Sequence, residues 1–447
     1  MPRWVDHLLH VPPERPAMPM AIPQEPEIDS RSPNGKATSS GAPTGEFWPD
    51  IPHPPPINEG RLMTLLVVSM FVVVTNVNMM APLLVDFAAD FHTTVGAMGV
   101  LAAAAAVPWA ILAPFMGALS DKYGRRPVFI TGVTLLGIAT LVASQAWSYE
   151  SLLVMRVLGG IGGASTGPNL MSAAADFFPA SRRGRALGMV VAAVSLATVI
   201  GVPALAEAAA LFGWRWAFAG LGAILLAVAA LNWKGFPRVH STPRVGNPMA
   251  GLALVLSERS TRLLLLANTL ERAAFTTVGT YLAAFLMQSY ELRLDQVVPV
   301  LFATAAGTLI GSIVGGRMAD AVNRPVLLYS GFQLLAAVGG IPLFLTTPGV
   351  IPTAVLASAF GLVNSLGRPS WMWLISQVPE SRRGATMGFT ATSNQIGLMV
   401  GAAVGGLLVG YGGYTALGIQ VSCAAMLSAF TCLLGAATLP GRKGMAT

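Results

Sequence analysis

The sequence has little charge for its length. Of its 447 residues, 11% are Asp, Glu, Lys or Arg, whereas a soluble domain carries about 25% charged residues. A helix of about 20 apolar residues crosses the ~30 Å core of a bilayer, and lipid forces a spanning backbone to be helical. Charge-free runs of that length occur at 62–85, 93–120, 127–149 and 296–316. The composition excludes an ordinary water-soluble domain and predicts an all-α protein embedded in a lipid bilayer.

Cysteine and histidine are also scarce. The two cysteines, Cys423 and Cys432, lie in one apolar run, which excludes a disulfide framework. The five histidines lie outside every predicted span, so we expect no metal site; they are His7, His10, His53, His92 and His240. A glycine-rich phosphate-binding loop is missing too, which excludes an ATP-driven pump. We therefore expect no cofactor, and we expect a protein that is not an enzyme.

The hydrophobic runs predict twelve membrane-spanning helices. They lie near 62–85, 95–118, 127–147, 150–174, 185–207, 216–234, 263–287, 296–316, 325–346, 350–375, 385–409 and 414–438. The predicted organisation is a disordered N-terminal tail over 1–60, a six-helix bundle over 61–234, a linker over 235–262, a second six-helix bundle over 263–438 and a short tail over 439–447. The first tail is assigned because it holds 14 of the 32 prolines and no long apolar run.

Lys and Arg lie mostly in one set of the connections between spans. That set and the segment after the last span contain Lys122, Arg125, Arg126, Arg182, Arg183, Arg185, Lys234, Arg238, Arg244, Arg259, Arg262, Arg317, Arg324, Arg382, Arg383, Arg442 and Lys443, whereas the opposite connections carry Arg215 and Arg293. Basic loops stay in the cytoplasm, so both termini are predicted to be cytoplasmic, in the inner membrane if the cell is bacterial. This placement also accounts for the net charge of +7 without a nucleic-acid partner.

Short basic motifs recur at an offset of about 200 residues. Residues 117–127 (GALSDKYGRRP) return in degenerate form at 315–325 (GGRMADAVNRP), and Pro-x-Ser-Arg-Arg-Gly occurs at both 179–184 and 379–384. Internal repeats of this kind are typical of membrane transporters built by duplicating a helical bundle.

The first of these motifs resembles motif A of the major facilitator superfamily. The matching residues are Gly117, Leu119, Asp121, Gly124, Arg125 and Arg126. Residues 156–164 (RVLGGIGGA) resemble the basic motif of the same family. The resemblance covers roughly 62–438 and implies two pseudo-symmetric six-helix bundles around a central cavity. It is closest to the 12-helix drug:proton antiporter and sugar-efflux branches, although Val202 separates Gly201 from Pro203 where antiporters have an adjacent Gly-Pro pair.

The resemblance implies a gating latch at motif A. Asp121 would dock against the N-terminus of a helix of the other bundle near Gly384, because a helix N-terminus carries roughly half a positive charge. The repeat would make the symmetric contact, with Asp320 near Gly184. Asp176 is the predicted partner of Arg125. The latch residues are Gly117, Asp121, Gly124, Arg125, Arg126 and Asp176, and those of the repeat are Gly316, Asp320 and Arg324.

Charges inside predicted spans are the strongest chemical signal, because each costs several kcal/mol unless paired or hydrated. They are Arg156, Glu271, Arg272 and Arg368. Counted from the cytoplasmic ends of their spans, Glu271 lies about 12 Å deep and Arg368 about 10 Å deep, so an ion pair is predicted. Glu271 is the candidate for proton coupling. Asn76, Asn78, Arg156, Arg272 and Arg368 are the candidates for the lining of the solute cavity, and their excess of positive charge favours an anionic or zwitterionic solute.

Glycines at intervals of four residues predict close approach between helices. One set is Gly307, Gly311 and Gly315, and the other is Gly397, Gly401 and Gly405. For both, the family resemblance implies partner helices in the other bundle, along a seam on which the two bundles rock. A third set, Gly159, Gly163 and Gly167, is expected to serve static packing.

We conclude from the sequence that the chain is a secondary active transporter. Proton-coupled efflux of a small organic solute by alternating access is favoured, with a monomer as the expected state and the bilayer, the solute and protons as partners. A proton-coupled uptake symporter of an organic anion or sugar-like solute would have the same fold. A non-transporting membrane sensor or enzyme is a third reading.

Overall fold

The computed structural model describes residues 58–237, 257–322, 324–345, 349–377 and 380–438, apart from a few side chains within these ranges. The predicted tails and most of the predicted linker lie outside the described residues. The helices are α1 (Glu59–Asn78), η1 (Ala81–Leu83), α2 (Leu84–Asp90), α3 (Val95–Ala104), α4 (Ala106–Tyr123), α5 (Arg125–Ala143), α6 (Tyr149–Ala164), α7 (Gly167–Phe177), α8 (Ala180–Leu196), η2 (Ala197–Gly201), α9 (Val202–Phe212), α10 (Trp214–Gly235), α12 (Arg259–Ser289), α13 (Leu294–Ala321), α14 (Pro325–Leu345), α15 (Val350–Ser376) and α16 (Glu380–Ala437).

The predicted all-α membrane fold is confirmed within these ranges. Nine described segments are long and apolar enough to cross a bilayer. One of them, 389–437, covers the last two predicted spans, while α6–α7 and α12 coincide with two predicted spans outside the nine. The two predicted spans 385–409 and 414–438 are separated at Gly413, whose φ of 64° and ψ of −163° interrupt the helical geometry of α16. A positive φ of this kind favours glycine because it has no Cβ.

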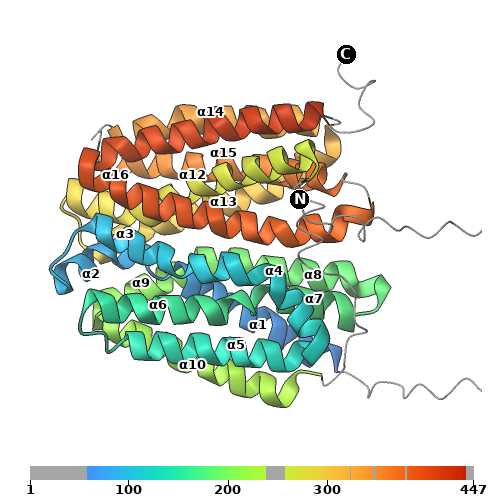
Figure 1. Ribbon diagram of the computed structural model, residues 1–447. Coiled ribbons are helices and arrows are strands. Elements are labelled where there is room, and N and C mark those ends of the chain that lie inside the picture. Colours follow the sequence, from blue (N-terminus) through green and yellow to red (C-terminus); the bar gives the residue numbers. More distant parts are fainter. Residues whose placement is uncertain (1–57, 238–256, 323, 346–348, 378–379, 439–447) are drawn as a thin grey trace, which may run out of the picture. The chain divides into compact units, whose positions relative to one another are not determined.

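The helices form two groups that lie side by side (Figure 1). We call α1–α10 the first half and α12–α16 the second half. In the first half α5 packs against α6 and α10, and in the second half α12 packs against α16 while α13 packs against α15. The halves meet where α3 and α4 contact α16, where α9 and η2 contact α13, and where η1 contacts α12. The division agrees with the predicted duplication, although the domain boundaries themselves stay predictions.

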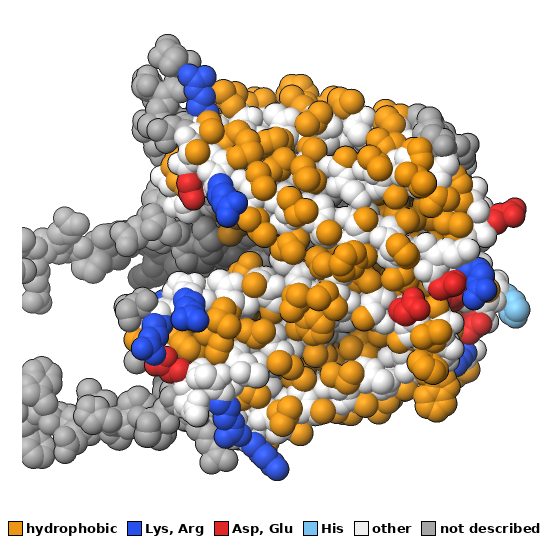
Figure 2. Space-filling view, turned by 180° about the vertical axis from the view of Figure 1, so that it is seen from behind, with side chains coloured by type: hydrophobic (Ala, Val, Ile, Leu, Met, Phe, Trp, Pro, Cys, Tyr) orange, Lys and Arg blue, Asp and Glu red, His pale blue; other side chains and the backbone are white. Residues whose placement is uncertain are grey.

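Charged side chains lie at the two ends of the helices. Figure 2 shows most Lys and Arg side chains toward one end, most acidic side chains toward the other, and a hydrophobic surface between them. We call them the basic end, where α4 meets α5 and α7 meets α8, and the acidic end, where α2 ends and α12 meets α13. An apolar band between two charged rims is what a lipid-facing surface requires.

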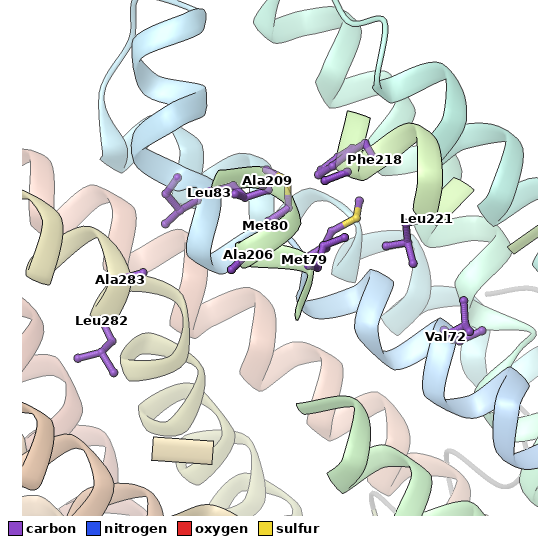
Figure 3. Packing of buried hydrophobic residues seen from close by; sticks show 14 of the residues in the cluster. Val72, Met79, Met80, Leu83, Ala206, Ala209, Phe218, Leu221, Leu282 and Ala283 are labelled. Carbon is purple, nitrogen blue, oxygen red and sulfur yellow. The ribbon is translucent and has the colours of Figure 1, made fainter. Parts of the chain in front are cut away.

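The helices of the first half are broken where those of the second half are continuous. The span predicted at 62–85 is interrupted after Asn78, the next at Ala105, the fourth at Ser165–Thr166, and the fifth by the π-helical turn η2. Buried hydrophobic side chains pack around these breaks (Figure 3). Met79 and Met80, both 1% exposed, lie in one hydrophobic cluster with Ala206, Phe218 and other residues of α9 and α10. Flexible methionine side chains fit such irregular packing.

The glycine seams are not where the sequence placed them. A Cβ on Gly307, Gly311 or Gly315 would collide with the carbonyls of Ser358, Leu362 and Leu366, which belong to α15 of the same half. Gly397, Gly401 and Gly405 face α12, again in the same half. The predicted contacts of these helices with the other half are present, since α13 packs against α9 and η2 and α16 packs against α3 and α4, but the two glycine sets do not make them. Both sets sit in tight packing inside the second half.

A pair of glycines makes one close approach between the halves. A Cβ on Gly96 of α3 would meet the carbonyl of Gly406 of α16, and a Cβ on Gly406 would meet the carbonyl of Gly96. Gly406 is one residue beyond the predicted set, so the helix turns a neighbouring face toward the first half. The static packing expected for Gly159 and Gly163 is present, against α5 and against Trp109 of α4 respectively.

Candidate functional site

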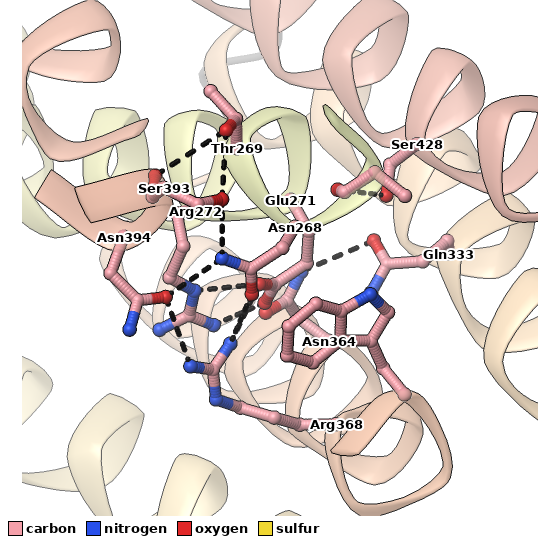
Figure 4. Close-up of polar contacts among 12 residues, drawn as sticks. Asn268, Thr269, Glu271, Arg272, Gln333, Asn364, Arg368, Ser393, Asn394 and Ser428 are labelled. Atoms are coloured by element: carbon pink, nitrogen blue, oxygen red, sulfur yellow. Dashed lines mark hydrogen bonds and ion pairs between the residues drawn. The ribbon is translucent and has the colours of Figure 1, made fainter. Parts of the chain in front are cut away.

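A buried ion cluster lies in the second half (Figure 4). Glu271 of α12 is 1% exposed. Arg368 of α15 donates from Nη1 to Glu271 Oε2 at 3.0 Å, so the ion pair predicted from matched depths is present. Arg272 donates from Nε to the same oxygen at 2.6 Å and from Nη2 to Oε1. One carboxylate therefore serves two guanidinium groups, and the cluster carries one net positive charge.

Neutral side chains hold this cluster in place. Asn268 donates from Nδ2 to Ser393 Oγ and to Asn394 Oδ1, both at 2.9 Å. Arg368 donates to Asn268 Oδ1 at 3.4 Å and to Asn394 Oδ1 at 3.3 Å. The network joins α12, α15 and α16, and sequence reasoning missed both asparagines. Asn268 and Asn394 each lie in a stretch without charged residues. Their own polar side chains were therefore the signal that could have identified them.

A second intramembrane cation, Arg156 of α6, lies in the first half. It is 6% exposed, and its Nε is buried without a hydrogen-bond partner. Among the described residues no carboxylate forms an ion pair with it. Arg156 lines a small pocket with Asn76, Trp109 and Gln395. The predicted cavity residue Asn76 donates to Thr140 Oγ1 at 2.8 Å, which fixes its amide against α5.

The main cavity lies between the halves and encloses about 1040 Å³ of empty space, part of it open to solvent. It is lined by apolar side chains together with Asn78 and several threonines, among them Thr276, Thr280, Thr304 and Thr308. The described residues that line it include no charged side chain. Asn78 lines it as predicted, although its amide already donates to the Val74 carbonyl at 3.0 Å. The cavity suits a largely apolar solute with a few groups that hydrogen-bond to hydroxyls.

The cavity adjoins both charged sites. It shares Val77, Ala102 and Leu398 with the Arg156 pocket. On the other side, the Arg272 guanidinium stacks over the ring of Phe275 at 4.6 Å from the centroid, and Phe275 lines the cavity. The structure thus brings Asn76, Asn78 and Arg156 to the cavity or the small pocket beside it. Toward the basic end, Glu271 and Arg272 lie about one helical turn from the cavity, and Arg368 lies about two turns from it.

The broken helices of the first half line this cavity, which the sequence did not predict. Met80, Ala81 and Pro82 contribute from η1, and Thr198, Val202 and Pro203 contribute from η2 and the start of α9. π-Helical turns occur frequently at functional sites. The available signal was a proline inside each predicted span, since Pro82 and Pro203 each open the segment that follows the break.

The motif A residues are only partly described. Arg125 donates from Nε to Asp176 Oδ2 at 3.1 Å, as predicted. Gly124 has a φ of 92° between α4 and α5, a conformation that favours glycine. Arg126 lies over the ring of Trp233 at 5.3 Å. The surroundings of Gly117, the side chain of Asp121 and the side chains near Gly384 lie outside the described part of the chain. The cross-bundle latch therefore stays a prediction.

Within the described residues, the repeat of motif A makes fewer side-chain contacts than the first copy. Asp320 and Arg324 are exposed, and within the described ranges neither side chain has an ion-pair or hydrogen-bond partner. The described residues show no contact of Asp320 near Gly184, and this part of the latch stays a prediction. A Cβ on Gly316 would also meet open space. Only the first copy of the motif forms a side-chain ion pair at the basic end.

Comparisons with known proteins agree with this architecture. The chain matches the family model described as Major Facilitator Superfamily, over residues 66–350 and 264–444. It is 29% identical over 348 residues to the chloramphenicol resistance protein of Streptomyces lividans, covering 77% of this chain and 87% of that protein. It is 25% identical over 309 residues to the 3-(3-hydroxy-phenyl)propionate transporter of Escherichia coli K12, covering 66% and 73%.

A solved structure supports the same fold. The bacterial homologue of the human lysosomal transporter Spinster, in an inward-facing and occupied conformation, superposes with a TM-score of 0.70 at 17% identity. The match covers 85% of this chain and 97% of that one. At this identity the likeness concerns the fold.

Proposed function

The chain belongs to the major facilitator superfamily, and from that premise we propose that it exports a small organic solute in exchange for protons, by alternating access. Membership makes it an integral membrane transporter rather than an enzyme. The finer assignment, which includes proton coupling, the direction of transport and the nature of the solute, is our proposal.

The observation that carries the proposal is the Glu271 cluster. A carboxylate that is 1% exposed and shared by two guanidinium groups is a place where uptake of a proton would change the local charge. When it is ionised it binds Arg272 and Arg368 together; when it is protonated it leaves two like charges at close range. Burial makes that difference large, because charges interact strongly in a medium of low dielectric constant. Since Phe275 joins the cluster to the cavity, protonation at Glu271 would alter the site that the solute occupies.

Export is favoured over uptake by a relative. The chloramphenicol resistance protein matches most of this chain, and resistance through a transporter requires removal of the compound. Uptake of an organic anion with protons is the alternative. It is supported by the similarity to the protein named 3-(3-hydroxy-phenyl)propionate transporter. The two functions differ in the side of the membrane on which the solute accumulates.

The test is accumulation in proteoliposomes with an imposed pH gradient. Purified protein is reconstituted, and radiolabelled chloramphenicol and 3-phenylpropionate are supplied outside. An antiporter accumulates the solute in an acidic lumen, because protons leave as solute enters, whereas a symporter accumulates it in an alkaline lumen. Protein-free liposomes and the Glu271→Gln variant are the controls. Accumulation in the alkaline lumen would replace export by uptake, and equal solute levels under both gradients would end the proposal of proton coupling.

We also propose that the basic end faces the cytoplasm, because Lys and Arg are retained on that side. In a bacterial cell this places the protein in the inner membrane. The Arg125–Asp176 ion pair then lies at the cytoplasmic face, where the latch predicted for Asp121 would close the cavity. Asp121→Asn is expected to slow transport at unchanged abundance and to raise the cytoplasmic accessibility of cysteines introduced into the cavity. Unaltered labelling would remove the latch.

A further inference from the structure

Arg156, the cation inside a predicted span of the first half, has no role in the transport mechanism above. We propose that Arg156 binds the anionic group of the solute, and that the solute is an amphipathic organic anion whose apolar body lies in the main cavity. The inference rests on the proposed transport function and adds the chemical class of what is carried.

The first observation is that, within the part of the chain that the structure describes, Arg156 has no counter-ion within reach. Of the helices packed against α6, α3 and α5 carry no acidic residue. Asp121 of α4 lies twelve residues beyond Trp109, which lines the same pocket, and twelve residues correspond to about 18 Å of helix rise. Asp176 of α7 is engaged by Arg125. Glu150 is on α6 itself, six residues away, at the helix start.

The second observation is the contrast with the other half. Removing a guanidinium group from water costs several kcal/mol unless an anion or hydrogen bonds compensate. Arg368 is compensated by Glu271 and two asparagines. Arg156 is 6% exposed and its Nε is orphaned. An anion that arrives with the solute would supply the missing partner, and charge-assisted hydrogen bonds of this kind are the strong ones.

The third observation is the continuity of the space. The Arg156 pocket shares Val77, Ala102 and Leu398 with the main cavity, so one molecule can reach both. The pocket also offers Gln395 and Asn76 as neutral polar neighbours, while the main cavity offers apolar surface and threonine hydroxyls. The described lining of both spaces contains no acid, so a lipophilic cation would meet only the like charge of Arg156.

The two arginines beside Glu271 are not alternatives for this role. Arg272 and Arg368 already bind that carboxylate, and an anionic solute would have to compete with it. Arg156 can accept an anion without breaking an existing ion pair. Three arginines and one glutamate leave an excess of two positive charges; one stays in the Glu271 cluster, and the other lies on Arg156.

The test compares three ligands that have the same apolar body. Binding of 3-phenylpropionate, 3-phenylpropanamide and 3-phenylpropylamine is measured at equilibrium, by calorimetry, on the full chain in lipid nanodiscs without a pH gradient. We expect the carboxylate to bind at least about tenfold more tightly than the amide, and the amine to bind most weakly. Failure of the carboxylate to bind, or an affinity no higher than that of the amide, would overturn the inference without any variant.

Variants then assign the preference to the residue. Arg156→Gln should remove the preference for the carboxylate while amide affinity changes by less than about twofold, and Arg156→Lys should restore part of it. Arg293→Gln, which removes an exposed cation at the acidic end, is the matched control and should keep the full preference. If Arg156→Gln weakens all three ligands equally and lowers the thermal midpoint, the side chain is structural and the inference is wrong.

Failure of this inference and failure of the proposed function are distinguishable. The binding series needs no gradient, so a strong carboxylate preference without proton-driven flux would contradict the proposed function alone. Proton-driven flux of chloramphenicol with no carboxylate preference would contradict the inference alone.

Discussion

The two halves of the molecule treat an intramembrane arginine in opposite ways. Arg368 lies on α15, within an unbroken helix, and is neutralised by Glu271 and held by Asn268 and Asn394. Arg156 lies on α6 among broken helices and has neither an acid nor a hydrogen-bonded Nε. A duplicated fold can therefore assign different tasks to its copies. In the second half the arginine already has an ion-pair partner, which suits the proposed protonation of Glu271. In the first half the described residues give Arg156 no such partner, which suits the proposed binding of an anionic solute.

The largest effect is expected from removing the carboxylate of the Glu271 cluster. Glu271→Gln leaves Arg272 and Arg368 as two like charges, so the free energy of unfolding should fall by about 3–5 kcal/mol and accumulation driven by a pH gradient should be lost. Folded protein should remain in the membrane. Flux and chemical unfolding of the same reconstituted preparation measure both.

Two companion variants sharpen this result. Glu207→Gln removes an acid near the acidic end and should leave flux intact. The double variant Glu271→Gln with Arg368→Gln removes one charge of each sign and should recover part of the stability but none of the coupling. Normal proton-driven flux in the single variant would remove Glu271 from the mechanism.

Arginine substitution tests the comparison directly. Arg368→Gln breaks an ion pair and two hydrogen bonds and should lower the free energy of unfolding by about 1–3 kcal/mol. Arg156→Gln removes an uncompensated cation and should leave the protein equally stable or more stable. Thermal unfolding of the ligand-free variants in one detergent gives the comparison, and equal losses would mean that Arg156 has a partner in the folded protein.

Glycine substitutions test whether the unbroken helices of the second half tolerate an added methyl group less well than the broken helices of the first half. In Gly311→Ala the new Cβ would strike the Leu362 carbonyl between the unbroken helices α13 and α15, with an expected loss of about 1–3 kcal/mol. In Gly160→Ala it would strike the Ala105 carbonyl, where the break between α3 and α4 can yield, so the loss should be smaller. Gly316→Ala, which faces open space, is the control. The reverse order in thermal unfolding would contradict the assignment.

The smallest effect is expected at the basic end of the first half. Asp176→Asn removes the ion pair with Arg125, whose side chain also donates to Ser120. Because Asp176 is only partly buried and Arg125 keeps a partner, the loss of stability should be about 0.5–1 kcal/mol. Thermal unfolding at low and high salt measures it. A loss as large as that of Glu271→Gln would show that the two halves are equally dependent on their ion pairs.

The helices could be predicted from the sequence because hydrocarbon imposes length and polarity on each span. Their breaks could not, because proline has two outcomes in this chain. Pro82 and Pro203 follow interruptions, yet Pro114, Pro299, Pro342 and Pro369 lie inside continuous helices. Neighbouring helices decide whether the freed backbone groups are satisfied in place, and that information is tertiary.

The candidate site, like the helices, could be predicted only in part. Depth counting brought Glu271 and Arg368 together because the rise per residue of a helix is constant. It gave no sign that Arg272 would share the carboxylate, since adjacent residues on a helix point in different directions. The glycine sets were assigned to the wrong partners, because spacing of four residues identifies one face of a helix but not the direction in which that face points.

The interruption at Gly413 has a mechanical consequence. One residue joins the two arms of α16, and a residue has only two freely rotating backbone bonds. The second arm is fixed to its own half, where Ser428 bonds Tyr329 and Ser422 bonds the Ala337 carbonyl. The first arm, from Glu380 to Gly413, is about 50 Å long at 1.5 Å per residue. Because Ser393 and Asn394 of the first arm are hydrogen-bonded to Asn268 of α12, a swivel at Gly413 would carry α12 with the arm, and each degree of it would move the far tip by about 0.9 Å.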